Sequence, residues 1–154
     1  MADDTPVDTD TLSAPWKAGW DAAMGFHYLR ASRDEVVVEY EVTGVHKQPY
    51  GIVHGGVHCG VVEAVCSTGA GIDAMARGQS VVGLENHTSF VRAVRGGKIT
   101  VTATPVTRGR RVQLWEAVCR DEQGRIVATG RVRLLCLEPG SELAGETVRA
   151  VPRG

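Results

Sequence analysis

The chain has 154 residues and a formal net charge of -1, and 43% of its residues are hydrophobic while 23% are charged. A chain of this length favours one domain, which can bury a continuous core without disulfide or metal staples. The composition is that of an ordinary globular protein, with no apolar run long enough to span a bilayer and no basic-then-apolar leader. We therefore expect a cytoplasmic protein with no membrane partner.

Charge is distributed unevenly along the chain. Residues 1–13 are acidic and contain no Lys or Arg, and residues 138–154 lack any sustained hydrophobic period. Both ends are therefore predicted to be flexible extensions around one domain at residues 14–137. The modest basic excess within that domain lacks the basic stripe and interleaved aromatics of a nucleic-acid-binding surface. It predicts no nucleic-acid partner but would suit a small polyanion.

Cysteine and histidine spacing argues against a disulfide framework or a metal site. Cys59, Cys66, Cys119 and Cys136 stand singly in apolar segments, which is typical of reduced core cysteines. His54 and His58 have the i, i+4 spacing of helical zinc ligands, but no Glu follows His54 and no third ligand stands out. We expect no bound metal.

The region from residue 36 to 137 predicts a strand, one long helix and four more strands. Val36, Val38, Tyr40 and Val42 alternate with charged residues, as in a strand with one wet face. The segment from residue 55 to about 76 is too long and too rich in Ala, Gly and Cys for a strand. Strand-like runs separated by turn residues follow at 80–94, 98–107, 111–121 and 125–137. We expect an α+β fold in which a curved antiparallel meander wraps one buried helix.

Glu63 is the feature of this helix that most needs an explanation. No other residue between His58 and Asp73 carries a charge. A carboxylate on a largely apolar helix is costly to desolvate, which makes it a candidate base or nucleophile. The alternative is a structural carboxylate that is capped by Ser67, one turn further on, or paired with an arginine across an interface.

The start of the helix predicts an oxyanion site. Free backbone N–H groups and the positive dipole end lie there, and Gly55 and Gly56 would let a substrate approach closely. Glu63 lies eight residues, or about 12 Å of helical rise, beyond Gly55. One chain therefore cannot easily bring both groups to the same carbonyl, and we expect a site that spans two chains.

Together these patterns resemble a known family. The His-Gly-Gly turn, an acidic residue eight positions after Gly55, and the closing segment G-R-I-V-A-T-G-R resemble hotdog-fold acyl-CoA thioesterases over residues 25–137. Within that superfamily the chain is most similar to the PaaI-like and 4-hydroxybenzoyl-CoA thioesterase branch. The resemblance implies a hotdog fold with a sheet of five to six strands. It also implies hydrolysis of an acyl-CoA without a cofactor, because CoA is part of the substrate.

The resemblance also implies roles for individual residues and a partner. Two protomers would pair their sheets and run their helices antiparallel, so that Glu63 of one chain meets Gly55 of its mate. Gln48 and His54 would touch the thioester or the attacking water, although either could be a plain loop or capping residue. Ser67 would orient the nucleophile, although the branch commonly has Thr there. Self-association into a dimer is implied, while a tetramer with its helices inward or outward stays open.

Several alternatives remain open at this point. Glu63 can attack the acyl carbon itself or remove a proton from water. The acyl group can be aryl or medium-chain. A non-catalytic hotdog protein that binds acyl-CoA or a fatty acyl ligand is the second hypothesis, and a dehydratase is a weaker third because its D-x-x-x-x-H arrangement is absent. The arginines proposed for the CoA phosphates, each of which could instead be a solvated surface residue, are Arg92, Arg110, Arg108 and Arg111.

Overall fold

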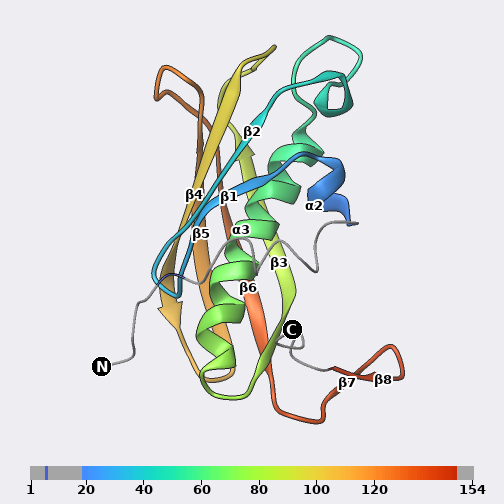
Figure 1. Ribbon diagram of the computed structural model, residues 1–154, viewed down its shortest axis with the longest axis vertical. Coiled ribbons are helices and arrows are strands. Elements are labelled where there is room, and N and C mark those ends of the chain that lie inside the picture. Colours follow the sequence, from blue (N-terminus) through green and yellow to red (C-terminus); the bar gives the residue numbers. More distant parts are fainter. Residues whose placement is uncertain (1–5, 7–18, 149–154) are drawn as a thin grey trace.

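The computed structural model describes residue 6 and residues 19–148 (Figure 1). The predicted extension at 1–13 therefore lies outside the described residues, apart from residue 6. The elements are α2 (Trp20–Ala23), β1 (His27–Ala31), β2 (Val36–Glu41), the 3-10 turn η1 (Gly44–His46), α3 (Gly55–Met75), β3 (Ser80–Phe90), β4 (Lys98–Arg108), β5 (Val112–Arg120), β6 (Ile126–Leu137), β7 (Glu142–Leu143) and β8 (Glu146–Thr147).

Six strands form one antiparallel sheet in the order β1-β2-β4-β5-β6-β3, and α3 lies along it (Figure 1). One long helix held by a curved antiparallel sheet is the hotdog arrangement, so the predicted fold class is confirmed. The helix bounds agree with the prediction to within one residue at the C-terminal end. Strand β1 and the short α2 were not predicted.

The predicted four-strand meander is wrong in one respect. Strands β4, β5 and β6 do form a meander, but β3 pairs with β6 at the far edge instead of with β4. The reason is that β2 occupies the outer edge of β4, in a register that places Val38 opposite Val101. The chain after β3 therefore crosses the end of the molecule before β4 begins, and β3 ends at Phe90 rather than near residue 94.

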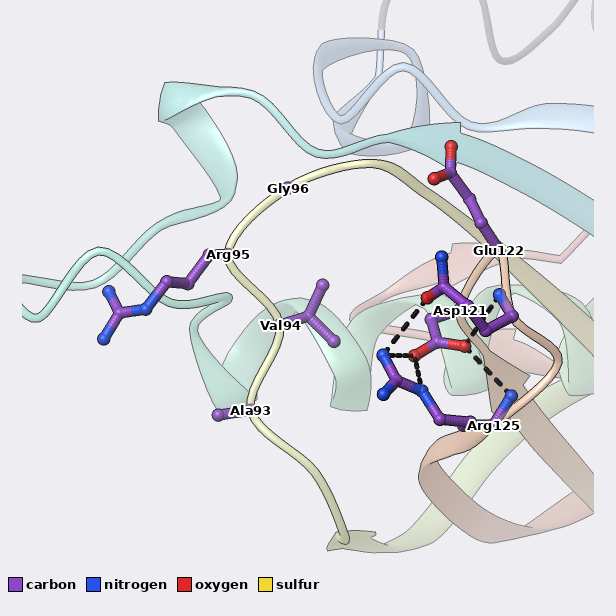
Figure 2. A pocket seen from close by; sticks show the side chains of 8 residues that line it. Ala93, Val94, Arg95, Gly96, Asp121, Glu122 and Arg125 are labelled. Atoms are coloured by element: carbon purple, nitrogen blue, oxygen red, sulfur yellow. Dashed lines mark hydrogen bonds and ion pairs between the residues drawn. The ribbon is translucent and has the colours of Figure 1, made fainter.

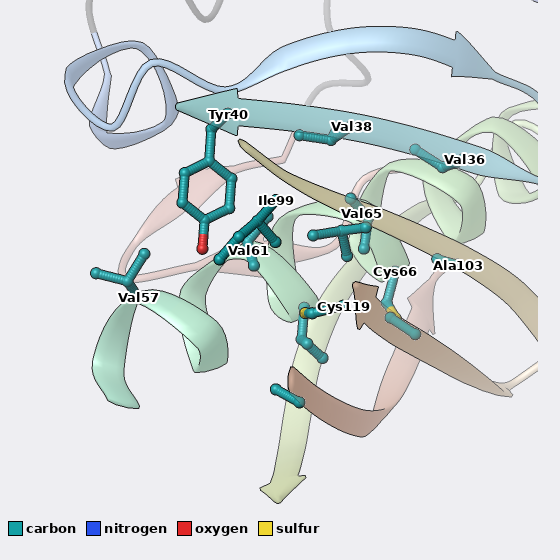
Figure 3. Close-up of a cluster of buried hydrophobic side chains, with 14 of the residues drawn as sticks. Val36, Val38, Tyr40, Val57, Val61, Val65, Cys66, Ile99, Ala103 and Cys119 are labelled. Atoms are coloured by element: carbon teal, nitrogen blue, oxygen red, sulfur yellow. The ribbon is translucent and has the colours of Figure 1, made fainter. Parts of the chain in front are cut away.

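The core lies between α3 and the concave face of the sheet. Figure 3 shows Tyr40 and Ile99 from the strands packed against Val61 and Val65 of the helix, and all four are 2% exposed or less. Alternating strand residues supply one wall and the helix supplies the other, as the period-two pattern predicted. Cys119 is also buried in this core, and burial raises the pKa of its thiol to about 12. It therefore stays protonated near neutral pH.

A buried ion-pair cluster holds the C-terminal end of α3. Asp73 is 1% exposed, and its carboxylate contacts Arg33 at 2.9 Å and Arg77 at 2.8 Å. The side-chain amide of Gln113 in β5 donates to the same carboxylate at 3.1 Å, and Trp115 donates to the carbonyl oxygen of that amide at 2.9 Å. The β1–β2 turn, the helix and the sheet are thereby joined at one point.

The tail that follows β6 contains a short hairpin. Strands β7 and β8 pair with each other, and the backbone N–H of Val148 donates to the carbonyl of Ser141 at 2.8 Å. Residues 149–154 lie outside the described part. Among the described residues, no helix has the length and apolar character needed to cross a membrane.

Candidate active site

The N-terminus of α3 has one backbone donor that the fold leaves available. His54 is the N-cap residue, and its Nδ1 accepts a hydrogen bond from Gly56 N–H at 2.8 Å. That contact consumes one of the two donors expected from the sequence. Gly55 N–H has no backbone acceptor within the described part of the chain. Gly55 N–H is therefore the available candidate for an oxyanion contact at the positive end of the helix dipole.

Glu63 lies two turns further along α3, on the side that faces β3. Ser67 Oγ donates to its Oε1 at 3.1 Å, and Asn86 Nδ2 donates to its Oε2 at 3.3 Å. Asn86 also donates to the carbonyl of Cys59 at 2.9 Å. The expected contact between Ser67 and the carboxylate is therefore present, and a strand residue supplies a second donor. Both carboxylate oxygens are held in place, and the side chain is only partly buried.

Gly83 in β3 gives the carboxylate the space it occupies. A Cβ atom at Gly83 would lie 2.5 Å from Glu63 Oε1, which is too close for two non-bonded atoms. Strand β3 also shifts register between Gly83 and Glu85, so the glycine lies at an irregularity of the ladder. A glycine inside a strand pattern often marks such a close approach.

Replacing Gly83 by alanine is therefore expected to displace the carboxylate while every reacting group remains present. Because a misplacement of about 1 Å can cost about 100-fold in rate, we expect kcat to fall by about 10- to 100-fold. Steady-state kinetics of the thioester hydrolysis that the resemblance implies would measure this. Gly71→Ala is the matched control, since its Cβ would lie 3.7 Å from Val81, an ordinary contact. Equal kinetics for the two variants would contradict the role given to Gly83.

The loop before α3 positions Gln48 near the start of the helix. Gln48 N–H donates to the carbonyl of Ile52 at 2.9 Å, and the Gln48 side-chain oxygen accepts from Tyr50 N–H. The loop packs against the segment after β3, because Val53 N–H donates to the carbonyl of Val94 at 2.8 Å. Gln48 and His54 thus lie on the same side of the fold as Gly55, as the proposed roles require.

Phe90, the last residue of β3, and Arg92, two residues after it, lie at this same site. A Cβ atom on Gly55 would lie 2.7 Å from two ring atoms of Phe90, so the ring covers the first residue of the helix. Phe90 is 59% exposed. Arg92 comes two residues later and is exposed, and its side chain has no partner among the described residues. Arg95, which the sequence reasoning did not single out, donates to the carbonyl of Tyr50 at 2.8 Å.

The other three candidate arginines lie at the opposite end of α3. Arg108 contacts Asp34 and the carbonyl of Arg33, while Arg110 approaches Glu138 at 3.9 Å. The carbonyl of Arg110 accepts from Gln79, which follows the helix C-terminus, and Arg111 is the neighbouring residue. About 30 Å of helix separates this end from Gly55 in one chain. The fold therefore does not bring these arginines to Arg92 within a protomer.

A hollow of about 220 Å³ lies beside the candidate site, but neither Gly55 nor Glu63 lines it. Figure 2 shows its lining from the segment after β3 and from the β5–β6 turn, where Asp121 and Arg125 bond each other and Arg95 points away. Two acidic side chains, Asp121 and Glu122, line it, and its Arg125 is already paired, so it is poorly suited to an anionic ligand. We do not take it as the substrate site.

Within one chain, the oxyanion donor and the carboxylate are separated. Glu63 lies eight positions after Gly55 along a regular helix, so both groups cannot hold one carbonyl. Among the described residues, no group of three or more His, Cys, Asp or Glu side chains is arranged to hold a metal ion. Sequence reasoning missed Asn86 and Gly83. Gly83 carries a weak signal as a lone glycine in a strand, whereas Asn86 is an ordinary polar residue until β3 is placed beside α3.

Comparisons with known proteins give a consistent result. Residues 50–128 match the family model described as the thioesterase superfamily. A protein of Mycobacterium tuberculosis (strain H37Rv) named "Putative esterase Rv1847" is 38% identical over 121 residues, which are 77% of this chain and 86% of that protein. A Haemophilus influenzae protein (strain Rd) named "Putative esterase" is 38% identical over 87 residues, which are 56% of this chain and 62% of that protein.

Solved structures show the same fold. The M. tuberculosis protein Rv1847/MT1895 superposes with a TM-score of 0.76 at 39% identity, covering 77% of this chain and 96% of that one. AziG of S. sahachiroi gives a TM-score of 0.76 at 39% identity, covering 79% of this chain and 98% of that one. Thioesterase HI1161 from Haemophilus influenzae gives a TM-score of 0.83 at 26% identity, covering 90% of this chain and 96% of that one.

Proposed function

Because the chain belongs to the thioesterase superfamily, we propose that it hydrolyses an acyl-CoA to the free acid and CoA at a site formed by two protomers. The observation that carries the proposal is the environment of Glu63. The carboxylate is partly buried, held by Ser67 and Asn86, and placed where Gly83 leaves room for its oxygens. Both carboxylate oxygens are thereby held in one orientation, as a general base or a nucleophile requires.

The free edge of β3 supports a two-chain site. Among the described residues, β3 pairs with β6 alone, and most of its side chains are exposed, including Leu84 and Phe90. An unpaired edge of this length is a template for another strand. Pairing two copies of β3 across a two-fold axis would run their α3 helices antiparallel, because α3 packs beside β3. Glu63 faces β3 and would then lie beside the partner's helix.

In this assembly the reaction needs few groups. Gly55 N–H of one protomer binds the carbonyl oxygen and stabilises the negative charge that develops on it, a contribution of about 3 to 4 kcal/mol for one donor. Glu63 of the other protomer either attacks the acyl carbon, giving a mixed anhydride that water then hydrolyses to the free acid, or takes a proton from the attacking water. In either route the C–S bond breaks and the CoA thiolate leaves. A thiolate is a good leaving group, so no strong general acid is required.

The other candidate residues would bind the substrate around the two reacting groups, Gly55 and Glu63. Gln48 and His54 flank the start of the helix and would contact the thioester or the water. Arg92 is the candidate for a CoA phosphate, since it is exposed beside Phe90 and carries no competing ion pair in the described structure. Arg108, Arg110 and Arg111 could serve a substrate at this site only from another protomer.

A panel of acyl-CoAs tests the function directly. Aryl and medium-chain thioesters are incubated with the protein, and the released thiol is followed with a thiol-reactive dye. Hydrolysis of at least one class is expected. Binding of acyl-CoA without thiol release across the panel would instead support the non-catalytic alternative.

The shared site predicts complementation between two inactive variants. Gly55→Pro removes the N–H, and proline is well tolerated at the first position of a helix. His54 already has the extended backbone (φ -67°, ψ 134°) that a following proline favours. Each variant alone, this one or Glu63→Gln, should hydrolyse thioesters at about 1% of the wild-type rate or less. Mixed dimers would contain one intact site, so a randomised equal mixture should recover about a quarter of wild-type activity.

Gly55→Ala is the control for this experiment, because it keeps the N–H while adding the same Cβ beside Phe90. It should retain more activity than Gly55→Pro. A mixture that stays inactive, although mixed dimers are demonstrated by mass spectrometry, would show that each site lies within one chain.

A further inference from the structure

His58 is a buried group that the mechanism proposed above does not use. The residue is 3% exposed, and its Nδ1 is buried with no hydrogen-bond partner among the described residues. Burial lowers the pKa of this imidazole to about 4, so the ring is neutral near neutral pH. Buried polar atoms are nearly always paired, so an orphan of this kind needs an explanation such as a bound group.

Another buried histidine in this fold, His46, has hydrogen-bond partners for both ring nitrogens. His46 is 2% exposed, but its Nδ1 accepts from Thr43 N–H at 2.9 Å and its Nε2 lies 2.8 Å from the carbonyl of Met24. The unpaired nitrogen of His58 is therefore specific to its position, one turn into α3.

Phe90 connects this position to the oxyanion donor. The rings of His58 and Phe90 have centroids 6.1 Å apart, and the same Phe90 ring lies against Gly55. Phe90 is more than half exposed, at the end of the edge strand β3, so its ring can move aside without disturbing the core. A ligand held at Gly55 N–H would then lie within about one helical turn of His58.

The chemistry of the substrate decides which of its ends can reach His58. The CoA part is large and polyanionic, and placing its charges in the interior would be costly. It must therefore remain toward the exposed side, where Arg92 lies. The acyl group is the part that can enter beneath Phe90. A neutral imidazole has one donor and one acceptor nitrogen, and a hydroxyl group can pair with either.

We propose that His58 determines substrate specificity by hydrogen-bonding, through Nδ1, a hydroxyl substituent on the acyl group of the thioester. This inference rests on the proposed thioesterase activity. It predicts a preference for hydroxylated acyl groups over those that lack the hydroxyl, because only a hydroxylated acyl group gives the buried nitrogen a hydrogen-bond partner in the complex.

The test compares kcat/KM for two matched pairs, 4-hydroxybenzoyl-CoA with benzoyl-CoA and 3-hydroxybutyryl-CoA with butyryl-CoA. Wild-type protein should prefer the hydroxylated member of at least one pair by about tenfold or more. His58→Phe keeps a ring beside Phe90 and removes both nitrogens. It should abolish that preference while kcat/KM for the deoxy member stays within about threefold of wild type.

Tyr40→Phe is the matched control, because the Tyr40 hydroxyl is also buried without a described partner but belongs to β2. It should keep the preference. His58→Leu provides the same readout if His58→Phe does not fold, as judged by circular dichroism. An unchanged preference in the folded His58 variant, or none in wild type, would overturn the role of His58 alone. Absence of any hydrolysis by wild type, including the wider panel, would overturn the proposed function as well.

Discussion

Replacing Glu63 by glutamine is expected to lower kcat for thioester hydrolysis by about 10²- to 10⁴-fold, the range associated with loss of a general base. A nucleophilic role predicts a loss at least as large. Glutamine has the same shape and can still accept from Ser67 through its carbonyl oxygen. The protein should therefore stay folded, keep its oligomeric state and continue to bind acyl-CoA. Timed assays of thiol release measure kcat, calorimetry measures acyl-CoA binding, and size-exclusion chromatography measures the oligomeric state.

Glu85→Gln is the control for this substitution. Glu85 lies on β3 close in sequence to Asn86, is exposed, and pairs with Arg133 at 3.0 Å on the surface. Removing that charge should leave kcat within about twofold, since exposed ion pairs contribute little and Glu85 does not contact Glu63. If Glu63→Gln retained wild-type turnover, the carboxylate would be structural, and the proposed mechanism would be wrong.

Replacing Asp73 by alanine is expected to destabilise the fold by about 3–5 kcal/mol, the cost of breaking a buried ion pair from one side. The change would leave the guanidinium groups of Arg33 and Arg77 and the amide of Gln113 without their shared partner. Because total stability is only about 5–15 kcal/mol, this is a large share of it. Urea denaturation followed by circular dichroism, at one fixed protein concentration, measures the loss.

Glu116→Ala is the comparison for this measurement. Glu116 pairs with Arg131 at 3.2 Å, but both side chains are exposed to solvent. Such surface pairs contribute about 0–1 kcal/mol, so the midpoint should move little. A similar small shift for Asp73→Ala would mean that the buried cluster does not hold the helix end in place.

Local patterns in the sequence predicted much of this molecule. The alternation around Val36–Tyr40 predicted a strand, and the long segment rich in Gly, Ala and Cys predicted the helix. The spacing of apolar residues in each segment reflects which of its faces are buried. The His-Gly-Gly turn placed the start of the helix at Gly55. Glu63 stood out because a single charge on an apolar helix is costly without a role.

Those local patterns did not predict the order of the strands in the sheet. Period and turn residues describe one strand at a time, while the pairing of β3 with β6 depends on β2 having taken the outer edge of β4. The same limit applies to Asn86 and Gly83, which matter only because β3 lies beside the helix. Local spacing likewise does not identify the partners of Asp73, because Arg33 lies in a turn 40 residues earlier in the chain.

The sequence by itself determined the fold class, the long helix and the pair of groups, Gly55 and Glu63, on which the proposed chemistry depends. These follow from short-range spacing, which the primary structure contains directly. Only the tertiary structure decided that Gly56 N–H is consumed by His54, that Asn86 and Ser67 hold the carboxylate, and that His58 has a buried nitrogen without a partner. Those facts depend on contacts between segments distant in the chain or on side-chain directions, which local spacing does not specify.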